Sequence, residues 1–305
     1  MMKKIVIILS LILAVTGCTS TGTSEKLVDN GVAVNKRLER PMRILMINDD
    51  GYDALGAQML YEELESKGHE VWIVAPIDNQ SGAGTSIKWN KKPHKLVKYG
   101  ERKYAFEGSP TDCFKVAVNL LMDEKPDLVI SGVNDGPNFG EVQFNSGTVG
   151  GAARAIRHGY PSMAVSLVYY GGDDENLGSH LEPAVDYTAN IVEKLSDEWK
   201  AGRMIMPLGT GISINYPLGS VKGLKFIGNE NVYTDFQNYK YGEDGKIYNY
   251  NDMEKFSAEI KDISIETDLT ESNRGYITVT VIDGDWDASG VKAEYMEEVL
   301  KGIQF

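Results

Sequence analysis

The sequence predicts an α/β fold, with a Rossmann-like, doubly wound and mostly parallel sheet and a C-terminal β-hairpin extension. The first reason is that short apolar runs alternate with segments of helical spacing from residue 43 onwards, as in successive βαβ units. The second is that polar, glycine-rich loops follow these runs, at the strand ends where such sheets bind ligands. The 305 residues are 42% hydrophobic and 25% charged, which allows a core and excludes disordered, collagen-like and disulfide-rich classes.

The first βαβ unit begins with the apolar run over residues 43–47, which is typical of a buried parallel strand. Residues 56–67 have helical spacing, and Gly68 supplies the stop. A second apolar run over residues 71–75 predicts the next strand. These three segments are the smallest unit of a parallel sheet.

A second cycle predicts a strand over residues 128–130, a helix over 150–158 and a strand over 162–166. Helical spacing continues over 183–195, and an extended segment covers 212–217. The sheet therefore extends through most of the chain.

The C-terminal part has a different composition, because residues 229–250 are rich in Tyr, Asn, Asp and Gly. Residues 243–246 (Glu-Asp-Gly-Lys) have a hairpin turn signal. A strand is expected over 275–281 and a final helix over 291–303. We assign residues 41–228 to the core and 229–305 to a C-terminal segment.

The N-terminus has the features of an export signal: Lys3 and Lys4, an apolar run over residues 5–15, and small residues up to Cys18. The run is too short to span a membrane. Its ending, Val-Thr-Gly-Cys, resembles a bacterial lipobox, which predicts a signal peptide over 1–17, lipidation of Cys18 and a tether over 18–40. A plain secretory signal and an N-terminal anchor are the alternatives.

The location that follows is outside the cytoplasmic membrane. By comparison with other lipobox sequences, Thr19 favours sorting to the outer membrane, facing the periplasm, in a Gram-negative host. Otherwise the outer face of the plasma membrane is expected. After cleavage Cys113 is the one remaining thiol, so no intramolecular disulfide can form, and we expect it to be a buried small hydrophobe.

The net charge of −13 and the pI of about 4.9 give no basic footprint for a nucleic acid duplex. An anionic substrate would need local help such as a metal ion. The chain also lacks Gly-x-Ser-x-Gly, and its four histidines have no paired zinc spacing. Gly51 and Gly56 match a P-loop spacing, but Ala57 and Gln58 replace the required Lys and Ser/Thr.

The strongest positive feature is the adjacent pair Asp49 and Asp50, directly after the first strand. Two neighbouring carboxylates repel each other, and a hard divalent cation relieves that cost. On this feature alone an ordinary turn pair is equally supported. Ser81 and Asn134, in the loops after two other strands, offer further oxygen ligands. Such a set suits Mg²⁺ or Mn²⁺ better than zinc.

A second feature is the run from Asn138 to Ser146, Gly147 and Thr148, which leads into a helix. Backbone N–H groups and hydroxyls at a helix N-terminus suit a phosphate group. Taken alone, capping by Ser146 or Thr148 is the more common explanation. Together with the carboxylates, however, this loop points to phosphoryl chemistry.

These residues resemble the SurE family of metal-dependent nucleotidases. The similarity rests on ordered motifs: RILMINDDGYDALG, VAPIDNQSGAG, EGSPTDC, PDLVISGVNDGPNFG and NSGTVGGAARAIRHGYPSMAVSL, followed by SINYP and ETDL. It implies one divalent metal ion per subunit on Asp49, Asp50, Ser81 and Asn134, and phosphate contacts from Asn138, Ser146, Gly147 and Thr148. It also implies a hairpin exchanged between subunits of a homodimer or homotetramer.

The expected activity is hydrolysis of nucleoside 5′- or 3′-monophosphates by a lipid-anchored enzyme, with Asp49 and Asp50 as the catalytic residues. A broad-specificity acid phosphatase is one alternative. The other is a non-enzymatic, receiver-like Mg²⁺-binding module, because an acidic pair after the first strand also suits a phosphoacceptor domain.

Overall fold

The computed structural model describes residues 39–171, 174–228, 237–251 and 264–285, together with residues 298 and 301. The expected signal peptide, the lipidated Cys18 and nearly all of the tether lie outside the described residues, as does almost all of the helix expected over 291–303. All of the described residues belong to one compact unit, Asn35–Phe305, which carries the fold described below. Within the described ranges, no helix combines the length and the apolarity needed to cross a membrane.

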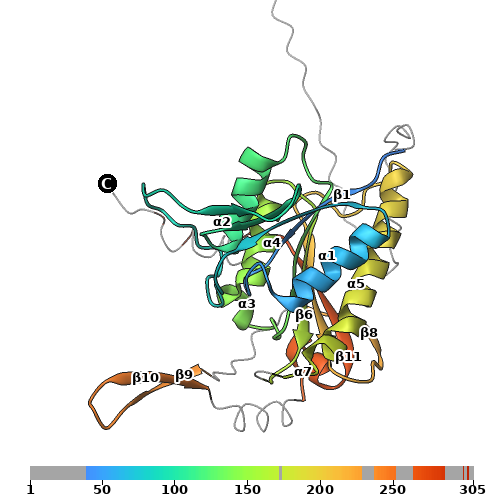
Figure 1. The fold of residues 1–305 in the computed structure, drawn as a ribbon. Helices are drawn as coiled ribbons and strands as arrows, with labels where there is room; N and C mark the ends of the chain where they lie inside the picture. Colours follow the sequence, from blue (N-terminus) through green and yellow to red (C-terminus); the bar gives the residue numbers. More distant parts are fainter. Residues whose placement is uncertain are drawn as a thin grey trace, which may run out of the picture. The chain divides into compact units, whose positions relative to one another are not determined.

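Nine strands form one sheet in the order β3-β4-β2-β1-β5-β6-β7-β11-β8 (Figure 1). Its centre is parallel and consists of β1 (Arg43–Ile47), β2 (Glu70–Pro76), β5 (Leu128–Asn134), β6 (Ser162–Val168) and β7 (Gly211–Pro217). The chain builds outwards from β1 on one side and from β5 on the other, so the topological switch point lies between β1 and β5. The predicted doubly wound α/β fold is confirmed.

The two sides of the sheet end differently. On one side β3 (Leu96–Lys98) pairs antiparallel with β4 (Lys103–Phe106). On the other, β11 (Tyr276–Ile282) lies antiparallel to β7 and parallel to β8 (Gly223–Phe226). The strand that the sequence grouped with the C-terminal segment therefore lies inside the core sheet.

The expected C-terminal hairpin is present. Strands β9 (Gln237–Tyr241) and β10 (Ile247–Asn251) pair antiparallel, with Tyr241 opposite Ile247. Residues 243–246, which carry the turn signal, lie in the connection between them.

Helices cover both faces of the sheet (Figure 1). Helices α1 (Leu55–Ser66) and α5 (Leu177–Lys200) pack together on one face. On the other face lie α2 (Pro110–Val116), the short π-helical segment η1 (Ala117–Leu121) and α4 (Gly147–Arg157). Two further helices are short: α3 (Val142–Asn145) and α7 (Asp268–Asn273).

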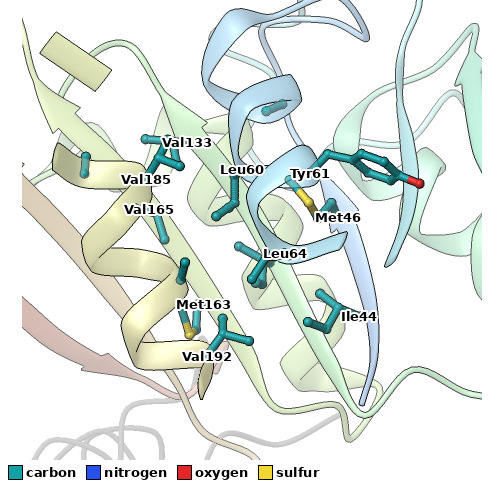
Figure 2. Close-up of a cluster of buried hydrophobic side chains, with 14 of the residues drawn as sticks. Ile44, Met46, Leu60, Tyr61, Leu64, Val133, Met163, Val165, Val185 and Val192 are labelled. Carbon is teal, nitrogen blue, oxygen red and sulfur yellow. The ribbon is translucent and has the colours of Figure 1, made fainter. Parts of the chain in front are cut away.

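The alternation of side chains along β1 explains why an apolar core lies on each face of the sheet. Ile44 and Met46 point to the α1/α5 face, where Figure 2 shows them near Leu60 and Leu64. Leu45 and Ile47 belong to the opposite core with Cys113 and Phe114 of α2. Successive residues of a strand point to opposite faces, so an unbroken apolar run is what a strand between two helical layers requires. Cys113 is fully buried, as expected.

Two helix starts differ from the prediction. Helix α5 begins at Leu177, and Pro183 lies inside it rather than at its first position. Burial of Leu181 and Val185 in the α1/α5 core holds the turns on both sides of the proline in helical form. Helix α4 begins at Gly147 rather than Gly150, because Ser146 caps it: the Ser146 Oγ accepts a hydrogen bond from the Val149 N–H at 3.0 Å.

Candidate active site

The predicted metal ligands lie at the carboxyl edge of the sheet, each at the end of a strand or in the loop that follows one. Asp49 and Asp50 follow β1, Ser81 follows β2, and Asn134 ends β5. The backbone joins two of these loops, because the Gln80 N–H donates to the Asp49 carbonyl at 2.6 Å. The loops thus surround the switch point between β1 and β5, where doubly wound sheets bind ligands.

Asp49 is held against the first turn of α4. Its carboxylate accepts a hydrogen bond from the Thr148 hydroxyl at 2.5 Å and interacts with the backbone N–H groups of Gly147 and Thr148. The approach is close enough that a Cβ added to Gly147 would lie 2.6 Å from the Asp49 Cβ. The side chain is 4% exposed, and this burial raises the pKa of Asp49, while the hydrogen bonds act in the opposite direction.

Burial, followed by the charges of Asp49 and Asp135, raises the pKa of Asp50 to about 8. A nearby positive charge stabilises the ionised form of such a buried carboxylate and so lowers its pKa again. Within the described ranges, no three His, Cys, Asp or Glu side chains form a metal-binding group. Among the described residues, neutral oxygens are therefore the candidates for the further ligands of a cation held by the two aspartates.

Asn134 and Ser81 are placed to supply such oxygens. The Asn134 Nδ2 donates to the Gly136 carbonyl at 2.6 Å, and the hydrogen bonds of the described residues leave its Oδ1 without a donor. Ser81 is exposed, and its N–H donates to the Asn79 Oδ1 at 2.8 Å, which fixes the loop. A donor set made only of oxygen fits a hard cation such as Mg²⁺ or Mn²⁺.

The four predicted phosphate contacts divide into two places. Gly147 and Thr148 lie beside Asp49, and the Thr148 hydroxyl proton is used in the bond to that carboxylate. Ser146 caps α4. Asn138 lies further along the sheet edge, where its Nδ2 donates to the Ser166 Oγ at 2.8 Å. The capping alternative is therefore observed for Ser146, and its contact with phosphate stays a prediction.

Two residues that form hydrogen bonds with the loop over residues 138–143 were not found from the sequence pattern. Asn215, within β7, accepts from the Asn138 N–H at 2.8 Å and donates to the Asn138 carbonyl at 2.9 Å. Asp268, the first residue of α7, accepts from the Gly140 N–H at 3.0 Å and from the Gln143 Nε2 at 3.1 Å. Both are buried. The only sequence signal at either position was its place in a family motif, SINYP or ETDL.

Comparisons with known proteins agree with this geometry. The family model described as survival protein SurE matches residues 44–242. A 5′-nucleotidase SurE from Jannaschia sp. is 34% identical over 81% of this chain and 95% of its own. One from Desulfitobacterium hafniense is 35% identical over 80% of this chain and 92% of its own. The crystal structure of a SurE protein from Aquifex aeolicus superimposes with a TM-score of 0.67 at 31% identity, covering 85% of this chain and 98% of that one.

Proposed function

The chain belongs to the SurE family and is a phosphoric monoester hydrolase of the 5′-nucleotidase type, and from this premise we propose that it hydrolyses nucleoside 5′- or 3′-monophosphates with one divalent cation, Mg²⁺ or Mn²⁺, per subunit. The observation that carries the proposal is the contact between Asp49 and Thr148. It joins the oxygen ligands of a cation to the helix N-terminus that would face a phosphate.

In the proposed mechanism Asp49, Asp50, Ser81 and Asn134 hold the cation. Held by these residues, a divalent cation would supply Lewis-acid chemistry to the substrate phosphate. Thr148 fixes the Asp49 carboxylate in place through its hydroxyl.

The phosphate contacts come from the loop and helix that follow β5. Asn138, Ser146 and the N-terminal turn of α4, which begins at Gly147, bind the phosphate and stabilise the negative charge that develops on its oxygens. Asn215 and Asp268 orient the loop that carries Asn138. The receiver-like alternative does not account for this second set of residues.

The setting of the enzyme is part of the proposal. We propose export, with a lipid anchor at Cys18, and a homodimer or homotetramer that uses the C-terminal segment over residues 229–305. Nucleoside monophosphate is the substrate partner, and no nucleic acid duplex is bound. A broad-specificity phosphatase differs from this proposal only in its range of substrates.

The test measures phosphate release by residues 19–305, which retain the whole of the compact unit from Asn35. Substrates are 5′- and 3′-nucleotides and p-nitrophenyl phosphate, each with Mn²⁺, with Mg²⁺ and with chelator. We expect chelator-sensitive release that favours nucleotides, reduced about 10²–10³-fold in Asp49→Asn. Full activity of Asp49→Asn with a normal metal requirement would contradict the assignment, and release from the aryl phosphate alone would make the protein a general phosphatase.

A further inference from the structure

One segment has the opposite charge to the rest of the protein. Residues 81–100 contain five lysines and no acidic residue. Because the whole chain carries −13, the remainder carries −18 when these five charges are set aside. All five side chains are exposed: Lys88, Lys91, Lys92, Lys95 and Lys98. A local cluster of this kind in an acidic protein attracts anionic partners to one face.

Two large apolar side chains lie beside these lysines. Trp89 is 89% exposed, and Leu120 at the end of η1 is 74% exposed. Both border a hollow of about 690 Å³, which Lys88, Lys91 and Lys115 also line. We call this surface the Trp89 face. It lies between residues 87–94, which precede the edge strand β3, and the α2–η1 segment.

The lysines of the Trp89 face have their charges available. None of the ion pairs among the described residues involves Lys88, Lys91, Lys92 or Lys115. The acidic residue that borders the hollow, Asp112, uses its carboxylate for backbone groups: it accepts from the N–H of Ser109 and from the N–H of Lys88, both at 3.0 Å. Three lysines line the hollow against this one carboxylate, so the face keeps a net positive charge.

We propose that the Trp89 face binds the surface of a bilayer rich in anionic phospholipid. Tryptophan prefers the headgroup level of a membrane, where its ring is in contact with apolar chains and its N–H with water. Each lysine near an anionic surface adds attraction, and a basic patch with apolar anchors is enough for reversible binding. A nucleic acid duplex fits less well, because its phosphate surface has no apolar layer that could receive the exposed side chains of Trp89 and Leu120.

The proposal does not depend on lipid at Cys18, so residues 19–305 are suitable for the test. Sedimentation with vesicles of phosphatidylglycerol and phosphatidylcholine, compared with vesicles of phosphatidylcholine alone, measures the binding at 50 and 300 mM salt. We expect binding only to the anionic vesicles, and weaker binding at high salt. Trp89→Ala should weaken it by removing the apolar anchor.

The double variant Lys91→Glu with Lys92→Glu removes two attractive charges and should bind at least about 30-fold more weakly. A matched control is Lys125→Glu with Lys194→Glu, which makes the same change in net charge at exposed positions on other elements. We expect less than about a threefold effect there, because distant charges are screened. Phosphate release from soluble nucleotides should be unchanged in both double variants, which also reports that they fold.

Three results would overturn the proposal: equal binding to both kinds of vesicle or to neither, equal weakening by both double variants, or no effect of Trp89→Ala. A raised KM for soluble nucleotides in Lys91→Glu with Lys92→Glu, with vesicle binding intact, would also overturn it. The cluster would then serve to attract the substrate.

Discussion

Replacing Gly147 by alanine tests the site most directly, because this residue touches the proposed metal ligand Asp49. The added methyl group would lie 2.6 Å from the Asp49 Cβ and 2.7 Å from its Oδ2, whereas ordinary contacts begin at 3.4 Å. The Asp49 Cβ is bonded to the backbone, so side-chain rotation cannot relieve the clash. Either the end of β1 or the first turn of α4 must move by about 0.8 Å.

A movement of this size separates Asp49 from Thr148 and changes the position of the cation relative to the phosphate. Displacements near 1 Å in a catalytic site cost on the order of 10²-fold in rate, and overpacking costs about 1–3 kcal/mol of stability. We therefore expect Gly147→Ala to lose on the order of 10²-fold in metal-dependent phosphate release, to require more metal, and to remain folded.

The assay combines phosphate release over a range of Mg²⁺ concentrations with thermal unfolding. The matched control is Gly178→Ala, a first-turn helical glycine of α5 whose nearest neighbour to an added Cβ is the Leu55 Cδ2 at 3.7 Å. It should keep the wild-type rate and gain up to about 1 kcal/mol of stability. If Gly147→Ala keeps both the rate and the metal requirement of the wild type, Asp49 does not hold the cation at this contact.

Three further predictions concern the groups around this contact. Thr148→Val keeps the shape of the side chain but removes the donor to the Asp49 carboxylate. It should lower the apparent metal affinity about 10–100-fold, and Thr148→Ser should recover it. A metal titration of activity checks this, and wild-type affinity in the valine variant would contradict it. Asp268→Asn weakens the acceptor for the Gly140 N–H and the Gln143 amide. It should raise KM several-fold, with a smaller change in kcat. An unchanged KM in a folded variant would show that the loop around Gly140 does not need the carboxylate. The raised pKa of Asp50, about 8, means that the folded protein binds this proton more tightly than the unfolded chain, so the free energy of unfolding of the metal-free protein should fall as the pH rises from 4 to 8. Added Mg²⁺ should restore most of the lost stability at pH 8. Asp50→Asn should flatten the dependence of the unfolding free energy on pH, as measured by thermal unfolding with and without chelator. Equal pH dependence in the wild type and in Asp50→Asn would exclude Asp50 as the cause.

The parts of the fold that the sequence predicted are those whose pattern is local. Buried parallel strands such as β1 and β6 consist mostly of apolar residues, and the loops that follow them must lie at one edge. That is why Asp49 and Asn134 could be brought together without coordinates. Short, partly exposed strands such as β3 and β8 bury few side chains and have no such pattern, so they were missed.

The contacts that orient the site could not be predicted in the same way, because they join distant parts of the chain. Asn138 and Asn215 are 77 residues apart, and Gly140 and Asp268 are 128 apart. Asp268 follows Thr267, a helix N-cap, and an Asp in the first turn of a helix is too common to indicate a partner. The Thr148 hydroxyl could equally have capped α4 or bound phosphate until the position of Asp49 was known.

The hydrogen bond from the Gly140 N–H to the Asp268 carboxylate also affects when the site can form during synthesis and folding. A ribosome adds residues in sequence, so the loop that carries Asn138 leaves it long before its anchor at Asp268 has been synthesised. Contacts between distant residues form late in folding, because a long loop must close first. The same holds for β11. It lies between β7 and β8 in the sheet, but it is the last of the sheet's strands to be synthesised. A nascent or truncated chain would hold both aspartates and still lack a completed site, so activity begins only where the whole chain has folded.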